Sequence, residues 1–158
     1  WMGYTEYRDA GVVSERPVMV GCQASGAAPF LRGYPVDEPE TIATAIRIGC
    51  PQSWALANQV QEESRGWFRE SSDEDILRAQ KVLAEREGIF CEPASAVCIA
   101  GLIAELECRN IPSGSTIVCT LTGHGLKDPD TAIAQSQKPV KVSPDPAAVR
   151  GVILEEIN

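Results

Sequence analysis

The sequence predicts an α/β fold in which a mostly parallel sheet is flanked by helices. Short apolar segments alternate with stretches of helical periodicity along its 158 residues, which is typical of strands covered by helices. The composition is 44% hydrophobic and 23% charged, which fits a globular chain and excludes the disordered and fibrous classes. A chain of this length can bury one core, so we expect one domain over residues 1–158.

The first half of the chain predicts three helices, one strand and a brief extended piece. Aromatic side chains recur every third residue over 1–10, which predicts a helix. The short apolar run at 18–22 lies between a proline and a glycine and predicts a buried strand. Residues 41–49 predict a short helix that ends at a glycine and a proline. A serine cap predicts a helix over 53–64, and a brief extended piece follows at 67–70.

The second half begins with two longer helices. Ser72, with Asp75 three residues later, resembles a capping box and predicts a helix that continues to Gly88. Pro93 suits the first position of the next helix, whose apolar residues surround most of its circumference, so we expect that helix to be largely buried. The β-branched and apolar segment 116–121 predicts a central strand.

The remaining residues predict a turn, a further helix and a tail. A glycine-containing turn at 122–125 precedes the pair 128–129, an aspartate and a proline that can start a helix. The tail at 136–158 carries an alternating piece at 140–142, which predicts a short strand. A helix opened by the Asp-Pro pair at 145–146 completes it.

Charge and composition exclude several partners. The chain has 14 Lys and Arg against 22 Asp and Glu, a formal net charge of −8 without a basic stripe, so we expect binding neither to nucleic acid nor to an anionic membrane surface. The longest apolar stretch, 96–104, is far shorter than the ~20 residues of a bilayer span, and no export leader opens the chain. The six cysteines form no CxxC pair. We therefore expect free thiols and a cytoplasmic setting.

Two segments lie where ligands gather in parallel α/β sheets, at the carboxyl ends of strands and at helix amino termini. The first is 121–128, where glycines allow close approach to the backbone and Thr122 offers a hydroxyl that can donate or accept a hydrogen bond. The second is 91–96, where Glu92 stands at the start of the buried helix. From the pattern alone, each segment is compatible with a ligand site or with plain packing.

Four motifs in these and neighbouring segments resemble threonine synthase, a pyridoxal-phosphate enzyme of fold type II. They are Glu-Pro-Ala-Ser-Ala at 92–96, Leu-Thr-Gly-His-Gly-Leu-Lys-Asp at 121–128, Thr-Ile-Ala-Thr-Ala-Ile-Arg-Ile-Gly at 41–49 and Gly-Cys-Gln-Ala at 21–24. Their order along the chain also matches. The resemblance extends from residue 1 to about residue 133 and is weaker in the tail.

The resemblance implies conversion of O-phospho-L-homoserine and water into L-threonine and phosphate, with pyridoxal 5'-phosphate as electron sink. Thr122 matches the family residue whose hydroxyl faces the ring nitrogen of that cofactor. Glu92 resembles the acid beside the ring, Ala43 resembles a residue that lines it, and Gly123 belongs to the tight turn of the cofactor site. For Glu92, interaction with the helix dipole is an equally good interpretation.

The resemblance also implies what this chain does not supply. The family's Schiff-base lysine and its Gly/Asn-rich phosphate loop precede the position that Trp1 matches. We therefore expect a partial domain, the C-terminal portion of the large cofactor-binding domain, that forms one wall of a cleft, has no catalytic residue of its own and is inactive alone. The complete enzyme is expected to be a homodimer.

Other interpretations remain open at this point. The chain could be a non-catalytic fragment or remnant that binds a partner, or part of another fold-type-II enzyme such as a threonine dehydratase-like lyase. A hydrolase would pair Cys91 as nucleophile with His124 and Asp128, but Cys91 has an apolar context that disfavours the thiolate. A zinc site would need closely paired cysteine ligands, which the spacing does not provide.

Overall fold

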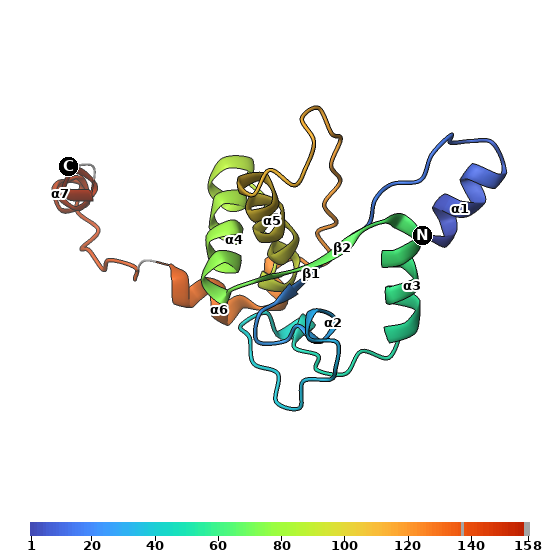
Figure 1. The fold of residues 1–158 in the computed structure, drawn as a ribbon. Helices are drawn as coiled ribbons and strands as arrows, with labels where there is room; N and C mark the ends of the chain where they lie inside the picture. The colour runs from blue at the N-terminus through green and yellow to red at the C-terminus, as the bar shows by residue number, and fades with distance from the viewer. Residues whose placement is uncertain (137, 157–158) are drawn as a thin grey trace.

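Two parallel strands form the centre of the computed structural model, which describes residues 1–136 and 138–156 (Figure 1). Strand β1 (Val20–Ala24) pairs with β2 (Trp67–Ser71) in a register that runs from Val20 opposite Trp67 to Ala24 opposite Ser71. The sequence predicts β1 with a shift of two residues, and β2 forms where a brief extended piece is expected at 67–70. The parallel pair with helices around it confirms the α/β class.

Helix α5 (Pro93–Glu107) packs against both strands, and helix α4 (Asp73–Glu87) packs against α5 (Figure 1). The predicted signals begin and end α4: Ser72 Oγ accepts from the Asp75 N–H at 3.1 Å, and Gly88 has a left-handed φ of 66°. Pro93 opens α5 as expected. The core lies between these two helices and β1, and consists of Ala24, Ala43, Ile76, Ala79, Leu83, Cys91, Ala94, Ala96, Val97 and Ala100.

Helix α5 is buried over its first half rather than throughout. Residues 93–97 are buried, but Leu106 is 50% exposed. Close contact with β1 depends on Gly101, where an added Cβ would lie 2.6 Å from Cys22 Sγ. The buried Glu105 carboxylate has two partners, Arg69 at 3.2 Å and the Asn110 side chain at 2.8 Å. A buried acid is therefore paired and hydrogen-bonded, as burial of charge requires.

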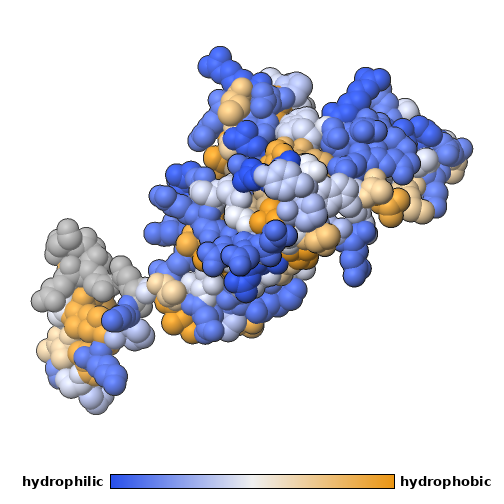
Figure 2. Space-filling view, turned by 60° about the horizontal axis from the view of Figure 1, so that its bottom comes forward, coloured by the Kyte–Doolittle hydropathy of each residue, from blue (hydrophilic) through white to orange (hydrophobic). Residues whose placement is uncertain are grey.

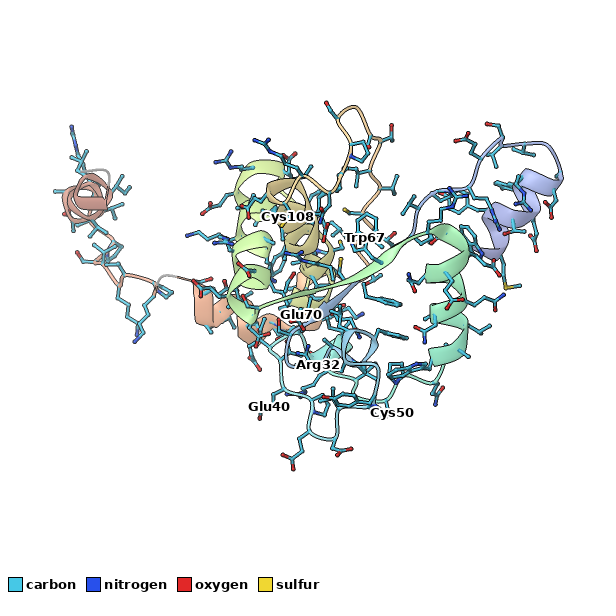
Figure 3. The ribbon with its side chains drawn as sticks, in the orientation of Figure 1. Arg32, Glu40, Cys50, Trp67, Glu70 and Cys108 are labelled. Atoms are coloured by element: carbon cyan, nitrogen blue, oxygen red, sulfur yellow. The ribbon has the colours of Figure 1, made fainter. Side chains whose placement is uncertain are left out.

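Helices α2 (Pro29–Arg32) and α3 (Trp54–Ser64) lie on the other side of the strands (Figure 1). The Phe30 ring stacks on Phe68 with centroids 4.6 Å apart and lies 5.0 Å from the Trp54 ring. Figure 3 places Arg32 of α2 beside Glu70 of β2, and these two side chains form an ion pair of 3.1 Å. The sequence correctly predicts α3, although no side-chain hydrogen bond from Ser53 caps it.

The predicted first helix is present as α1 (Met2–Asp9). Trp1, which comes immediately before this helix, is held by two contacts: its Nε1–H donates to Glu63 Oε2 at 2.6 Å, and the Arg16 guanidinium lies 4.0 Å from the centre of its ring. Tyr4 and Tyr7 are 43% and 59% exposed. The aromatic spacing therefore predicts the helix correctly, but it does not mark a buried face.

The helix predicted over residues 41–49 is wrong. Only a single 3₁₀ turn, η1 (Thr44–Ile46), forms there. Asp73, the first residue of α4, accepts hydrogen bonds from the Thr41 hydroxyl at 2.5 Å and from the Ile42 N–H at 3.0 Å. The Thr41 hydroxyl in turn accepts from the Ala43 N–H. Ala43 and Arg47, on either side of the turn, have ψ angles of 72° and 66°, which lie outside the helical region and confine the helical backbone to this single turn.

The strand predicted over residues 116–121 is also wrong. The segment forms no ladder with any strand in the described part of the chain, and Ile117 and Val118 are 43% and 81% exposed. Its β-branched composition indicates an extended backbone, but a strand also requires a neighbour with which to exchange hydrogen bonds.

The tail at 136–158 contains one helix and no strand in its described residues, and another helix comes directly before it. Helix α6 (Pro129–Gln135) begins as predicted, with the Asp128 carboxylate accepting from the Thr131 N–H. Residues 138–142, expected to include a short strand, have no regular structure. Helix α7 (Pro146–Glu156) lies apart from the rest of the molecule, and its apolar side chains form a patch in Figure 2. Residues 137, 157 and 158 of the predicted tail lie outside the described residues.

Among the described residues, every helix is too short or too polar to cross a bilayer.

Candidate functional site

The turn at residues 122–125 is fastened to the segment that leads into α5. The Glu92 N–H donates to the Gly123 carbonyl and the Gly125 N–H donates to the Phe90 carbonyl, both at 3.0 Å. These bonds form an isolated antiparallel bridge centred on Cys91 and His124. The His124 ring meets Phe90 edge-on with centroids 5.5 Å apart. The sequence places the two candidate segments far apart, and the fold joins them into one site.

Thr122 is exposed at this site, whereas Gly123 and Gly125 are buried beneath it. The Thr122 hydroxyl lies 3.2 Å from the Ser95 hydroxyl, which comes from the first turn of α5. A Cβ on Gly125 would overlap the Phe90 ring. The small residues of the turn therefore allow it to lie against the start of α5, with Thr122 as an exposed residue whose hydroxyl meets Ser95.

Glu92 is the residue immediately before α5 and is only 4% exposed. Its Oε1 lies 3.5 Å from Lys127 Nζ, and it makes no side-chain cap bond to the helix. A Cβ on Gly123 would overlap Glu92 Oε1, so the carboxylate packs directly against the turn. The fold therefore brings Glu92, Gly123 and Thr122 together, with Lys127 beside them.

Ala43 lies deeper than the other candidate residues. It is 0% exposed and belongs to the same core cluster as Ala94 and Ala96 of α5. The bonds from Thr41 and Asp73 described above hold its backbone in place. No hydrogen bond joins it to the Thr122 turn in the described part of the chain.

Ser95 is the site residue that the sequence reasoning did not single out. It is 2% exposed, and its oxygen accepts from the Gly123 N–H at 2.7 Å. The sequence does contain a signal for it. Ser95 is a polar residue three positions after Glu92 in a mostly apolar helix, and a polar side chain that is buried needs a hydrogen-bonding partner.

The arrangement does not suit a cysteine hydrolase. Cys91 is 2% exposed, and burial raises the pKa of its thiol. His124 Nδ1 accepts from the Leu126 N–H at 3.2 Å, so that nitrogen already has a partner. Asp128 accepts from Thr131 instead of orienting the histidine. The nucleophile, the base and the orienting acid therefore do not act on one another as such a mechanism requires.

The thiols of Cys22 in β1, Cys98 in α5 and Cys119 lie close to one another. Burial, with further contributions from Cys119 and Glu105, raises the pKa of the Cys22 thiol from 9.0 to about 11. Burial and the neighbouring thiols of Cys119 and Cys22 raise the pKa of Cys98 to about 12. All six cysteines are free, and Cys50 and Cys108 are exposed on separate parts of the molecule (Figure 3).

The raised pKa values of these thiols predict that the protein loses stability at alkaline pH. Between pH 9 and about 11 the unfolded Cys22 thiol is ionised while the folded one keeps its proton, so the folded state binds more protons and the free energy of unfolding falls as pH rises. We expect Cys22→Ala to flatten that decline in urea titrations at pH 8, 9 and 10. Cys108→Ala is the control and should leave the slope unchanged. Equal slopes in wild type and Cys22→Ala would contradict the assignment.

Comparison with known proteins shows the family to which this chain belongs. The model of a family described as "Pyridoxal-phosphate dependent enzyme" matches residues 2–123. The threonine synthase of Mycobacterium bovis is 52% identical over 149 residues, which cover 94% of this chain and 41% of the relative. The threonine synthase of Synechocystis sp. is 48% identical over 146 residues, or 92% of this chain and 38% of the relative. The chain thus spans about two fifths of the length of these curated relatives.

Among solved structures, a threonine deaminase from T.th. has a TM-score of 0.45 and 22% identity, covering 59% of this chain and 31% of that one. The family model, in contrast, matches well over half of this chain and includes both Glu92 and Thr122. The chain belongs to the family of pyridoxal-phosphate-dependent enzymes.

Proposed function

We propose that this chain forms the wall of a threonine synthase active site that faces the ring nitrogen of pyridoxal phosphate. The complete enzyme would convert O-phospho-L-homoserine and water to L-threonine and phosphate. The observation that carries the proposal is the Thr122 hydroxyl, which belongs to an exposed residue and lies within hydrogen-bond distance of the buried Ser95 hydroxyl. The similarity to threonine synthases supports this choice of substrate.

The residues at the site fit this cofactor by their chemistry. A pyridine nitrogen needs one hydrogen-bonding partner, and a threonine hydroxyl can donate to it or accept from it. The cofactor, when bound, supplies an electron sink for the carbanion chemistry. Thr122 orients the ring without bringing a negative charge to the nitrogen, so it should stabilise the protonated nitrogen less than a carboxylate would. This would restrain side reactions such as transamination.

Glu92 and Lys127 extend this wall. Their ion pair of 3.5 Å keeps the local charge balanced beside Thr122, and the buried carboxylate supports the turn that holds the hydroxyl. We assign Gly123 to the turn and Ala43, which is 0% exposed, to the apolar core that supports the site from beneath. The covalent anchor and the groups that bind both phosphates would come from outside this chain, so we expect the chain alone to be inactive. We further propose a cytoplasmic homodimer for the complete enzyme.

The decisive experiment measures phosphate release from O-phosphohomoserine by a full-length protein that contains this chain. Thr122→Val removes the hydroxyl at nearly constant volume and should lower the rate by about 10- to 100-fold, the effect of one hydrogen bond to a charged group. Thr122→Ser keeps the hydroxyl and should retain most of the rate. Thr122→Asp should alter the visible spectrum of the bound cofactor. An unaltered rate in Thr122→Val would refute the role of this residue.

The same assay separates the alternatives. A threonine dehydratase-like lyase would release ammonia from threonine and no phosphate from O-phosphohomoserine. A non-catalytic remnant would do neither, even in the full-length protein. Turnover by this chain alone would contradict the expectation that its catalytic lysine lies elsewhere.

A further inference from the structure

The thiol of Cys98 lies beside Cys119 and beside the backbone that follows Cys119. A side-chain hydrogen bond joins the two thiols, and Cys98 Sγ lies 3.9 Å from the Thr120 carbonyl oxygen. Cys98 belongs to α5 and Cys119 to the extended segment 116–121, so the fold brings together two thiols that are far apart in the sequence. Two thiols this close can be joined by a disulfide bond with a small change in the backbone.

The same two parts of the chain also meet one helical turn earlier in α5. Ser95 Oγ lies 3.2 Å from the Thr122 hydroxyl and accepts from the Gly123 N–H at 2.7 Å. Helix α5 and residues 119–123 are therefore in contact at two places, one formed by hydroxyl and backbone groups and one formed by thiols. A covalent bond between the thiols would act directly on the segment that leads into the turn at 122–125.

Cys22 is the third thiol in this cluster and the alternative partner for either of the other two. It lies in β1 beside Gly101 of α5, and it acts on Cys98 through charge, without a hydrogen bond to it. The hydrogen bond between Cys98 and Cys119 therefore selects these two as the pair. Within the described residues, no group of three or more ligand side chains is arranged to hold a metal ion, so we do not assign the cluster to a metal.

The surroundings of the pair allow a small reagent to reach it. Cys98 and Cys119 are both partly exposed, whereas Cys91 is only 2% exposed. Burial and the neighbouring thiols raise the pKa of Cys98 to about 12, which keeps its reactive thiolate form scarce at neutral pH. The pair should therefore stay reduced until an oxidant is abundant.

We infer that Cys98 and Cys119 form a redox-sensitive pair, which hydrogen peroxide converts into a disulfide bond between α5 and the segment 116–121. In the first step the sulfur of one thiol attacks a peroxide oxygen, the O–O bond breaks, and a sulfenic acid and one water form. In the second step the other sulfur attacks the sulfenic sulfur, so the S–S bond forms and the hydroxyl leaves with the thiol proton as a second water. Two thiols are oxidised and one peroxide is reduced.

The disulfide bond should lower the activity of the full-length protein, and this part of the inference rests on the proposed function. A disulfide is much shorter than a contact between two thiols, so residues 119–121 must move toward α5 and pull on the turn that follows. A displacement of about an ångström at a site can cost about a hundredfold in rate. Because the contacts of Ser95 hold the turn in place, we expect a smaller loss, about tenfold in phosphate release, that dithiothreitol reverses.

Peptide mapping of the full-length protein tests the covalent step without reference to activity. After treatment with hydrogen peroxide and blocking of the remaining thiols, mass spectrometry of a digest made without reductant should find the peptides of Cys98 and Cys119 joined. Cys98→Ala and Cys119→Ala should each abolish this link, and either variant suffices if the other does not fold. Cys50→Ala removes an exposed thiol on a separate part of the molecule and should leave the link intact. A link through any other cysteine, or no link, would overturn the inference.

Phosphate release from O-phosphohomoserine then tests the effect of the bond. Peroxide should slow the wild-type protein reversibly, whereas Cys98→Ala and Cys119→Ala should keep their own untreated rates. If the link forms and the rate of the wild type does not change, the pair does not act as a switch and that part of the inference fails. If the reduced full-length protein releases no phosphate, the proposed function fails, and the peptide map still decides whether the pair is redox-sensitive.

Discussion

Gly123→Ala should displace the Thr122 hydroxyl and lower phosphate release in the full-length protein by about a hundredfold, the typical result of a site group moved by an ångström. The new Cβ would overlap Glu92 Oε1 and would lie 2.9 Å from Oε2. Glu92 is 4% exposed and paired with Lys127, so its carboxylate has little room to rotate. The turn must move instead, at a cost of about 1–3 kcal/mol in the free energy of unfolding.

Two variants control this prediction. Gly3→Ala makes the same chemical change in α1, where a Cβ meets no atom within 4 Å, and should leave phosphate release unchanged. The double variant Glu92→Ala with Gly123→Ala removes the obstructing carboxylate and should recover stability lost in the single variant. Wild-type stability and activity in Gly123→Ala would contradict the tight packing described for this turn.

Gly66→Ala should cause the largest loss of stability, about 3 kcal/mol or more in the free energy of unfolding. A Cβ at position 66 would overlap the Met19 carbonyl oxygen and would lie 2.8 Å from the carbonyl carbon. Met19 and Gly66 stand immediately before the two paired strands, so the obstacle is backbone and cannot rotate away. The strands would have to separate at their first pair, Val20 and Trp67.

Urea denaturation followed by far-UV circular dichroism measures this loss. Gly3→Ala again serves as the control and should be neutral or stabilising by up to about 1 kcal/mol, because alanine favours a helix over glycine. A denaturation midpoint for Gly66→Ala that equals that of Gly3→Ala would show that the strands tolerate the added carbon.

The helices that the sequence predicts well carry their signals within a few residues. Ser72 and Gly88 mark the ends of α4, and Pro93 marks the beginning of α5. These signals act on adjacent backbone groups, so they work with little help from the rest of the fold. Helix boundaries here are therefore the most predictable part of the structure.

Two of the wrong predictions, the helix at 41–49 and the strand at 116–121, depend on distant residues. Asp73 lies far along the chain from Thr41 and Ile42, yet its hydrogen bonds to them fasten the segment 41–49 to the start of α4. The segment 116–121 has a strand composition, but pairing is a property of two segments and composition describes only one. Neither the contacts of Asp73 nor the lack of a partner strand for 116–121 can be recognised from the local sequence.

The candidate site was predictable in part. The sequence marks Thr122, Gly123 and Glu92, and the structure brings them together through the bridge between Cys91 and His124. Ser95 was missed because its significance comes from a tertiary contact with Thr122. A buried serine in a helix has many ordinary uses, and only the geometry of its neighbours distinguishes this one.

The parallel pairing of β1 and β2 sets an order for folding. A parallel pair cannot be closed by a tight turn, and here the connection runs from residue 25 to residue 66. Helices α4 and α5 are joined by the short segment 88–92 and can meet with little entropic cost of loop closure. The helical hairpin should therefore assemble early, and docking of the two strands should limit the folding rate.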